Sequence, residues 1–268
     1  MNGIAVFHTV SKNVKFRSVS FPHNKTHETI LQEYNEVKHI YEAQGFKVTQ
    51  VCADNEFDCI KMNIMPAHLE TVGANEHVPE VERSIRYIKE CTRSCLHGLP
   101  YTKITKAMTI GIVKTVTKHC NAFYGADSVG DKLSPRNIVL GLPDLSFKRV
   151  CQMRTGMPAM VTVRRKKTNT MSTRAVEAIA LNPQNDHGSW YFQSLSTGRK
   201  IRSHIYKPLP IRDRIINRVK EIGTQDKMLN IQDGKMIFEW APGDPIDDDD
   251  LEVLQLNVAA QQQEQGAT

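Results

Sequence analysis

Strand-like and helix-like segments alternate through the first 95 residues, and this order constrains the fold more than any other feature of the sequence. Runs with alternating apolar residues predict strands, and apolar residues at helical spacing predict helices. Thr26 is placed to cap the first helix, and Gly45 is placed to end it. The predicted order is strands over residues 3–11 and 14–21, a helix over 26–45, a strand over 47–54, a short helix over 57–64 and a strand over 68–73. This alternation predicts a mixed α/β domain.

The next predicted helix begins at Pro79, because a proline at the first helical position loses no hydrogen bond. Glu80 and Glu82 lie in its first turn, near the positive end of the helix dipole. A core-facing stripe is predicted at helical spacing, formed by Val81, Ile85, Ile88, Thr92 and Cys95. One residue round the helix lies a second stripe, in which an acid precedes three bases: Glu82, Arg86, Lys89 and Arg93. This second stripe is either a solvated charged face or a metal-ligand carboxylate beside cations that hold a polynucleotide.

After Pro100 the sequence predicts a second long helix over residues 101–123, and from about Met153 the pattern changes. Short strand-like runs then alternate with Asn, Asp and Gly turns, which is typical of a small β-barrel or sandwich. An amphipathic helix follows, and the acidic end of the chain is too polar to bury a core. The predicted divisions are 1–150 for the α/β core, 151–210 for the small β-rich domain, 211–223 for the helix and 224–268 for a disordered acidic linker.

The charge is distributed unevenly. The chain has a formal net charge of +6, yet the residues from Thr224 onward carry ten acids and two bases, so the part before them carries about +14. A basic body predicts contact with a polyanion, although basic surfaces also occur for solubility alone. No apolar run is long enough for a membrane span, and the N-terminus lacks the order of a signal peptide. The six scattered cysteines indicate reduced thiols in an intracellular protein.

Asp54 stands at the end of a predicted apolar strand, where α/β folds place ligand-binding and catalytic groups. Two-metal phosphoryl chemistry needs carboxylates that converge from separate elements, and Asp54 and Glu82 meet that requirement. Mg²⁺, or Mn²⁺ in its place, is the expected ion because it takes hard oxygen ligands. The neighbouring acids Glu56, Asp58 and Glu80 are interpreted as surface acids.

Four segments resemble motifs of copia-type retrotransposon integrases, in the order in which that family carries them. "VCADNEFD" is similar to the strand-end motif "SDNGxEF", which carries the family's second catalytic aspartate onto Asp54. "PEVERSIRYIKECTRSCLHGLPY" resembles the segment with "GVAER", which carries the metal-binding glutamate onto Glu82. "LSPRNIVLGLPDLSFKRV" resembles the exit from the catalytic domain, and "GSWYFQSLSTGRKIRSHIYKPLP" resembles the β-rich segment beyond it. The resemblance covers roughly residues 2–222.

The resemblance implies an RNase H-like mixed sheet with flanking helices, followed by a small SH3-like β-barrel. It also implies metal-dependent strand transfer, in which a 3′ hydroxyl of element DNA attacks a target phosphodiester. The family's first catalytic aspartate precedes the segment that opens this chain, and residues 1–53 contain no aspartate. The chain is therefore expected to begin partway through the first strand and to lack strand transfer. The alternatives are a non-catalytic DNA-binding protein derived from such an element, and a relic without function.

The expected partner is DNA, both element ends and target, with a homo-oligomer as a further possibility and no membrane. In the parent polyprotein a reverse transcriptase module would follow downstream. The resemblance places the protein in the nucleus and in the cytoplasm, within virus-like particles. The predicted DNA contacts are Arg83, Arg86, Lys89, Arg93, Arg164, Arg165, Lys166 and Lys167. The last four also match a nuclear localisation signal or a solvated hairpin tip. Trp190, Tyr191 and Phe192 are expected to alternate between core and surface, with base stacking as the alternative.

Overall fold

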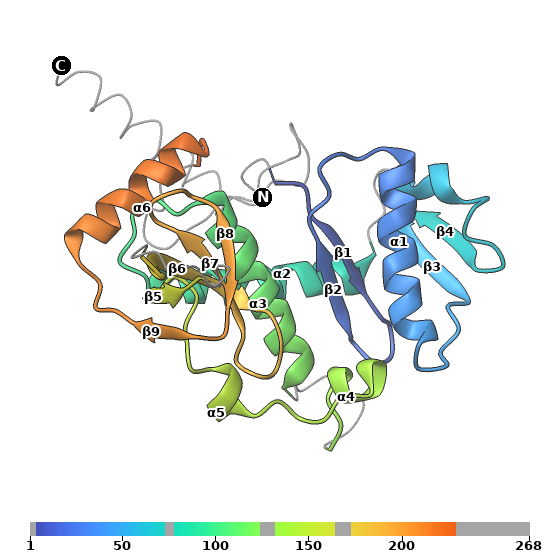
Figure 1. The fold of residues 1–268 in the computed structure, drawn as a ribbon. Helices are drawn as coiled ribbons and strands as arrows, with labels where there is room; N and C mark the ends of the chain where they lie inside the picture. The colour runs from blue at the N-terminus through green and yellow to red at the C-terminus, as the bar shows by residue number, and fades with distance from the viewer. Residues whose placement is uncertain (1–3, 73–77, 124–131, 164–172, 229–268) are drawn as a thin grey trace. The chain divides into compact units, whose positions relative to one another are not determined.

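The computed structural model describes residues 4–72, 78–123, 132–163 and 173–228 (Figure 1). The chain divides into two compact units. The N-terminal unit holds Ile4–Glu90 and Thr117–Asp144, and the sheet unit holds Cys91–Val116 and the described residues from Leu145 onward. Two long helices each supply residues to both units, so residues 91–116 belong with the β-rich part. The predicted boundary at residue 150 stays a prediction.

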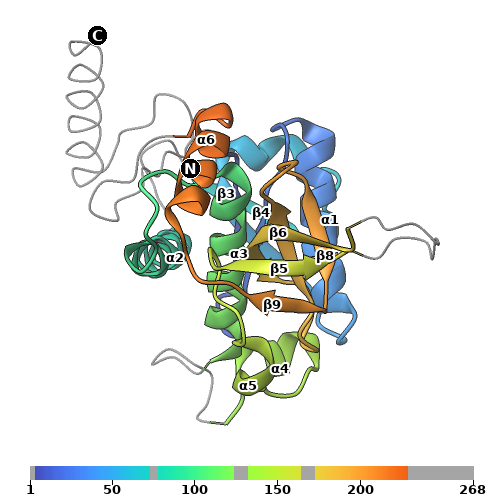
Figure 2. The same ribbon diagram turned by 60° about the vertical axis from the view of Figure 1, so that its left-hand side comes forward.

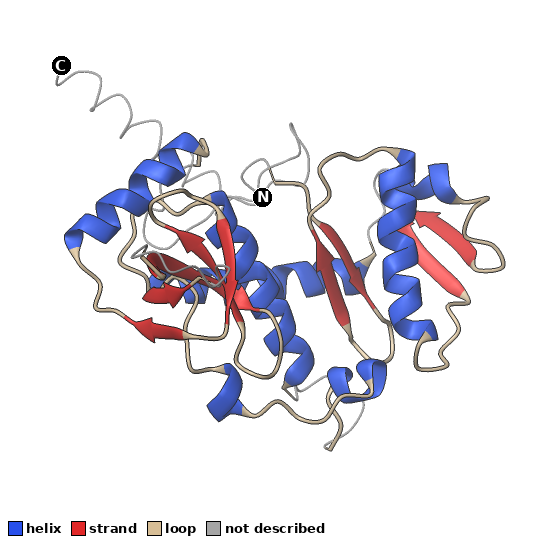
Figure 3. Ribbon diagram, in the orientation of Figure 1, coloured by secondary structure: helices blue, strands red, loops and turns tan. Residues whose placement is uncertain are grey.

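The N-terminal unit combines two pairs of strands with a helix that packs on both. Its elements are β1 (Phe7–Val10), β2 (Arg17–Ser20), α1 (His27–Glu42), β3 (Gln50–Asp54), the 3₁₀ helix η1 (Asn55–Ile60), β4 (His68–Val72), the start of α2 (Pro79–His97) and α4 (Pro135–Leu140). β1 and β2 are antiparallel, whereas β3 and β4 are parallel. Figure 3 shows the two pairs in red, with α1 beside them. The mixed α/β class predicted from the sequence is confirmed.

One apolar core holds the two strand pairs together. Phe7 of β1, Leu69 of β4, Tyr34 of α1 and Ile60 of η1 are buried in it. The rings of Phe7 and Phe57 lie 5.8 Å apart between centroids, which links the β1 side of this core to the η1 side. A two-stranded sheet is marginal on its own, so the packing on α1 stabilises both pairs. In the described residues the pairs are not joined into one sheet, and the RNase H-like arrangement stays a prediction.

The start and the end of α1 were each predicted from a single residue. Thr26 is the N-cap residue as predicted, but its side chain makes no capping hydrogen bond. The Thr26 hydroxyl bonds instead to Asn24 and Thr29. Gly45 has a positive φ of 78°, a conformation that glycine adopts without strain, and it follows the last turn of the helix. The predicted position of the helix is therefore confirmed, whereas the predicted role of the Thr26 side chain is wrong.

The helix α2 starts at Pro79, as the sequence predicts, and carries Glu80 and Glu82 in its first turn. Its buried side chains are Ser84, Ile88, Thr92 and Leu96. Of the predicted core stripe, Ile88 and Thr92 are buried, while Val81, Ile85 and Cys95 are only half-buried. The buried face is thus rotated from the predicted one, because Ser84 is buried in the second turn of α2 while Val81 and Ile85 are only half-buried.

The sheet unit is built on five antiparallel strands in the order β8-β7-β6-β5-β9. They are β5 (Pro158–Thr162), β6 (Ala175–Pro183), β7 (Trp190–Ser194), β8 (Lys200–Ser203) and β9 (Tyr206–Pro208). Trp190 and Phe192 are buried in the core of this sheet, while Tyr191 between them is half-buried, which confirms the predicted alternation. The sheet agrees with the predicted β-rich segment. Among the described strands β8 and β9 do not pair with each other, so no closed barrel is formed by strand pairing.

Besides the end of α2, the helices that accompany the sheet are α3 (Lys106–Ala122), the short α5 (Phe147–Val150) and α6 (Asp213–Gln225). The residues of α3 before Thr117 belong to this unit, and they pack closely on β6 (Figure 2). A Cβ atom on Gly111 would lie 2.7 Å from the carbonyl oxygen of Leu181, so only glycine permits this approach. The helix predicted over 211–223 is confirmed as α6.

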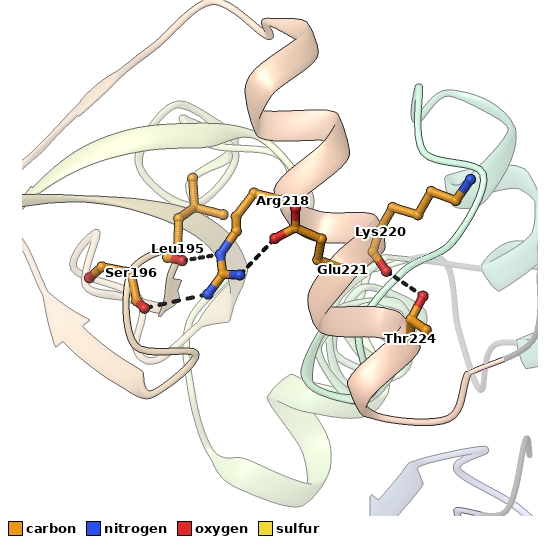
Figure 4. A network of polar contacts seen from close by, with 6 residues as sticks. All are labelled: Leu195, Ser196, Arg218, Lys220, Glu221 and Thr224. Carbon is orange, nitrogen blue, oxygen red and sulfur yellow. Dashed lines mark hydrogen bonds and ion pairs between the residues drawn. The ribbon is translucent and has the colours of Figure 1, made fainter.

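The α6 helix is held to the sheet by apolar packing and by polar contacts of its arginines. Ile215, Val219 and Ile222 are buried. The Arg218 Nε donates to the carbonyl oxygen of Leu195 at 2.8 Å, and its Nη1 pairs with Glu221 at 2.7 Å (Figure 4). These contacts fix the helix across the turn that follows β7. The predicted acidic linker, 224–268, lies almost entirely outside the described residues.

Candidate functional site

Asp54 is the last residue of β3 and is exposed. Val72, the last residue of β4, lies opposite it in the parallel register, so both strands end at the same edge. The carboxyl edge of parallel strands is where open α/β sheets place functional groups. The structure therefore puts Asp54 in the position that the sequence predicted.

Glu82 lies in the first turn of α2 and is exposed. Arg83 and Arg86 are exposed on the same helix, and Lys89 is half-buried. Since Ser84 and Ile88 are buried, helical geometry turns this charged stripe about 100° or more away from the core. Arg93 is half-buried on the part of α2 that belongs to the sheet unit. The predicted cluster Arg164–Lys167 lies outside the described residues.

The acids around Cys52 show which carboxylates of this unit lie near β3. Burial is the largest cause that raises the pKa of Cys52, and the carboxylates of Glu70 and Glu80 raise it further. Glu70 lies directly across from Cys52 on β4, and it accepts a hydrogen bond from Gln50 at 2.6 Å. The charge of Glu80, in the first turn of α2, thus acts on the strand that ends in Asp54. Glu80 had been interpreted as a surface acid, and it is half-buried.

Glu80 and Glu82 cannot both point toward β3 from a regular helix. Residues two apart on an α-helix project about 200° from each other. At most one of these two acids therefore faces β3, and the pair Asp54 and Glu82 stays a prediction. No local sequence pattern shows which of the two acids faces β3, because this depends on how α2 packs in its unit.

The described residues do not fit a metal centre. Within those ranges, no group of three or more His, Cys, Asp or Glu side chains lies close enough to hold a metal ion. Mg²⁺ is held through several oxygen ligands in near-octahedral geometry, and two carboxylates supply few of them. We therefore derive no chemical step through a metal ion, and the pair Asp54 and Glu82 stays a prediction.

A buried polar network anchors α2 two residues after Glu82. The Ser84 Oγ lies 2.9 Å from His8 Nε2 and accepts a hydrogen bond from the Arg17 Nε at 3.0 Å. His8 Nδ1 lies 3.1 Å from the carbonyl oxygen of Ser18, which can only accept. Nδ1 therefore carries the proton, and the Ser84 hydroxyl donates to Nε2. Burial is the main cause that lowers the pKa of His8 to about 4, so the ring is neutral at pH 7.

The same network ties α3 and the outer side of α2 to β2. The backbone N–H of Arg17 donates to Asn121 Oδ1 at 2.8 Å, and Asn121 Nδ2 donates back to the Arg17 carbonyl at 2.7 Å. The Arg17 guanidinium also lies 5.3 Å from the centroid of the Tyr87 ring. Sequence analysis did not single out His8, Arg17 or Ser84, because their contacts join segments far apart in the chain. They orient the charged stripe of α2 within its unit.

A pocket of about 430 Å³ lies in the sheet unit where α6 meets β6 and the turn after β7. Two arginines line it, but both already have partners. Arg214 pairs with Glu177, and Arg218 donates to the Leu195 carbonyl and to Glu221. These cations hold α6 in place, so we assign no ligand to the pocket.

The described elements make a mixed α/β protein in which one unit is built on an antiparallel sheet. No protein-family model matches the chain, and no curated protein matches it. Among solved structures, the chain is similar to one in the cryo-EM structure of the simian T-cell lymphotropic virus intasome in complex with the PP2A regulatory subunit B56 gamma. The identity is 13%, the match covers 78% of this chain and 77% of the other, and the TM-score is 0.32. A TM-score this low carries no argument about fold or function.

Two further findings concern the chemistry of the chain as a whole. All six cysteines are free, as the sequence analysis expected. None of the helices in the described ranges combines the length and the apolar character needed to cross a bilayer.

Proposed function

We propose that the chain is a DNA-binding part of a copia-like retrotransposon integrase and that it contacts the DNA backbone through the charged stripe of α2. The order of the four integrase-like motifs supports the family. The main support for DNA binding is that Arg83 and Arg86 are exposed on the side of α2 opposite its buried face.

Binding of this kind is electrostatic and reads no sequence. Arg and Lys that neutralise phosphates release condensed counterions, so affinity falls steeply as salt rises. Phosphate contacts fix the position of a protein on DNA without selecting bases. The buried Ser84 network fixes the face of α2 that presents these cations, which reduces the ordering cost of binding.

The test measures binding of a short fluorescent DNA duplex by anisotropy over a salt series. The double variant Arg83→Gln/Arg86→Gln is expected to reduce the salt slope by about 1.8, because each phosphate contact contributes about 0.9. The control Lys47→Gln/Lys61→Gln removes the same charge from exposed sites elsewhere in the unit and is expected to leave the slope nearly unchanged. Equal slopes for the two double variants would contradict the proposal, as would a wild-type chain that does not bind.

A second candidate is a DNA-binding protein that performs no strand transfer by itself. The finding that favours it is that no group of three or more metal-ligating side chains is brought together in the described ranges. Purified chain incubated with donor-end DNA and Mg²⁺ or Mn²⁺ is expected to give no joined product. Joined product above background that disappears in Asp54→Asn would show that the chain is itself catalytic.

A further inference from the structure

The edge of the five-stranded sheet carries a second group of cations that the function proposed for α2 does not use. β8 pairs with β7 and is the last strand on its side among the described strands. In their antiparallel register, Arg202 lies opposite Tyr191, and Lys200 lies opposite Gln193. Side chains two apart on a strand share a face, so Lys200 and Arg202 project on the same side as Tyr191. Both cations are exposed.

Lys200 is held in place by an aromatic ring. Its ammonium lies 3.9 Å from the centroid of the Tyr191 ring, as expected for a diagonal pair across two antiparallel strands. A cation over an aromatic face is stabilised by the ring quadrupole. Tyr191 is half-buried, whereas its neighbours Trp190 and Phe192 point into the core. The sheet therefore fixes the ring, and the ring fixes the lysine.

A third cation reaches this edge from α3. The register of β6 and β7 shifts between Ala180 and Asn182, and Leu181 at this irregularity is the residue against which Gly111 packs. This close approach brings the next turn of α3, with the exposed Lys114, toward Tyr191 and Lys200. Burial and, after it, the charge of Lys114 lower the pKa of Lys200. The charge of Lys114 therefore acts on the ammonium of Lys200.

We propose that Lys114, Lys200 and Arg202 form a binding site for nucleic-acid phosphates at the β8 edge, with Tyr191 as the residue that positions Lys200. The proposal rests on the proposed DNA-binding function and adds a second contact region, in the sheet unit. A phosphate between Lys114 and Lys200 relieves their mutual repulsion. Arg202 offers a bidentate contact to the next phosphate along the strand. The ring of Tyr191 has one face covered by the ammonium, so its role here is to orient the cation.

The experiment compares two triple variants of the full chain that lose the same charge. The first is Lys114→Gln/Lys200→Gln/Arg202→Gln. The matched control, Lys207→Gln/Arg212→Gln/Lys220→Gln, removes three exposed cations elsewhere in the sheet unit. Duplex DNA binding is measured by anisotropy over a salt series, and thermal melts confirm that both variants fold. The first variant is expected to lower the salt slope by about 2 to 3, at about 0.9 per phosphate, and the control by less than 1.

The outcomes separate this proposal from the one for α2. If wild-type chain binds DNA and both triple variants have equal slopes, the β8 site is refuted while the α2 contact stands. If the wild-type chain shows no salt-dependent binding, both proposals are overturned. For the role of Tyr191, Tyr191→Phe keeps a ring and is expected to bind like wild type, whereas Tyr191→Leu is expected to bind about two- to fivefold more weakly. An equal loss in both variants would assign the effect to the hydroxyl and reject the positioning role.

Discussion

Acid is expected to destabilise the N-terminal unit through His8. Burial is the main reason why the pKa of His8 falls from 6.5 to about 4. Between pH 6.5 and pH 4, His8 is protonated in the unfolded chain but neutral in the folded chain, so the stability falls as the pH falls. The contribution of neutral His8 to the free energy of unfolding is complete above pH 6.5 and is lost by about pH 4. At about 1.4 kcal/mol for each pKa unit, the whole effect amounts to about 3 kcal/mol.

The structural cause is specific. Neutral His8 accepts a hydrogen bond from Ser84 through Nε2, and a protonated ring has no acceptor there. Protonation would also place a second positive charge beside Arg17, whose charge already lowers the pKa of His8. A loss of about 3 kcal/mol is a large share of the stability of a typical domain, so it will be visible in an equilibrium experiment.

The assay is urea denaturation followed by circular dichroism at several pH values between 7 and 4. Carboxylates titrate in the same range, so the informative quantity is the difference between wild type and His8→Gln. That difference is expected to shrink by about 3 kcal/mol as the pH falls from 7 to 4, because the variant has no imidazole to protonate. His68→Gln, which removes an exposed histidine of the same unit, is the control. A difference that stays constant over this range would refute the neutral buried ring.

Two substitutions test the packing of the sheet unit by the same denaturation assay. Gly111→Ala is expected to destabilise by about 1–3 kcal/mol, because its Cβ would lie 2.7 Å from the Leu181 carbonyl oxygen. Alanine normally stabilises a helix relative to glycine, so a gain in stability would contradict the close approach of α3 to β6. Phe192→Ala is expected to cost about 3–5 kcal/mol, since its ring is fully buried, while Tyr191→Ala should cost less. Equal costs for the two would contradict the difference in burial between Phe192 and Tyr191.

Local signals in the sequence were enough to place most helices and strands. Pro79 marks the start of α2 because its chemistry suits that one position, and Gly45 follows the end of α1 because it tolerates a positive φ. The run ending in Asp54 reads as a strand because apolar and polar residues alternate, and β3 ends at that residue. Each of these features depends on neighbours within a few residues. The sequence therefore predicted the mixed α/β class and the carboxyl-edge position of Asp54.

The parts that sequence reasoning missed depend on contacts between distant segments. Ser84 lies on the buried face of α2, where an apolar residue would be expected. It is stable there because its hydroxyl forms hydrogen bonds with His8 and Arg17. A hydrophobic stripe assigns a serine to the surface, so the predicted face was rotated. The same limit applies to Glu70, which lies across from Cys52 only because β3 pairs with β4.

This limit decides how the candidate site should be tested. A motif places an acid at a chain position, but the phase of the helix decides which acid faces the strand. Because Glu80 and Glu82 project in nearly opposite directions, only one of them can face β3. The cations of the α2 stripe avoid this ambiguity, since a phosphate backbone is contacted from any exposed side. The proposed DNA-binding role therefore depends less on the phase of the helix than the proposed catalytic pair does.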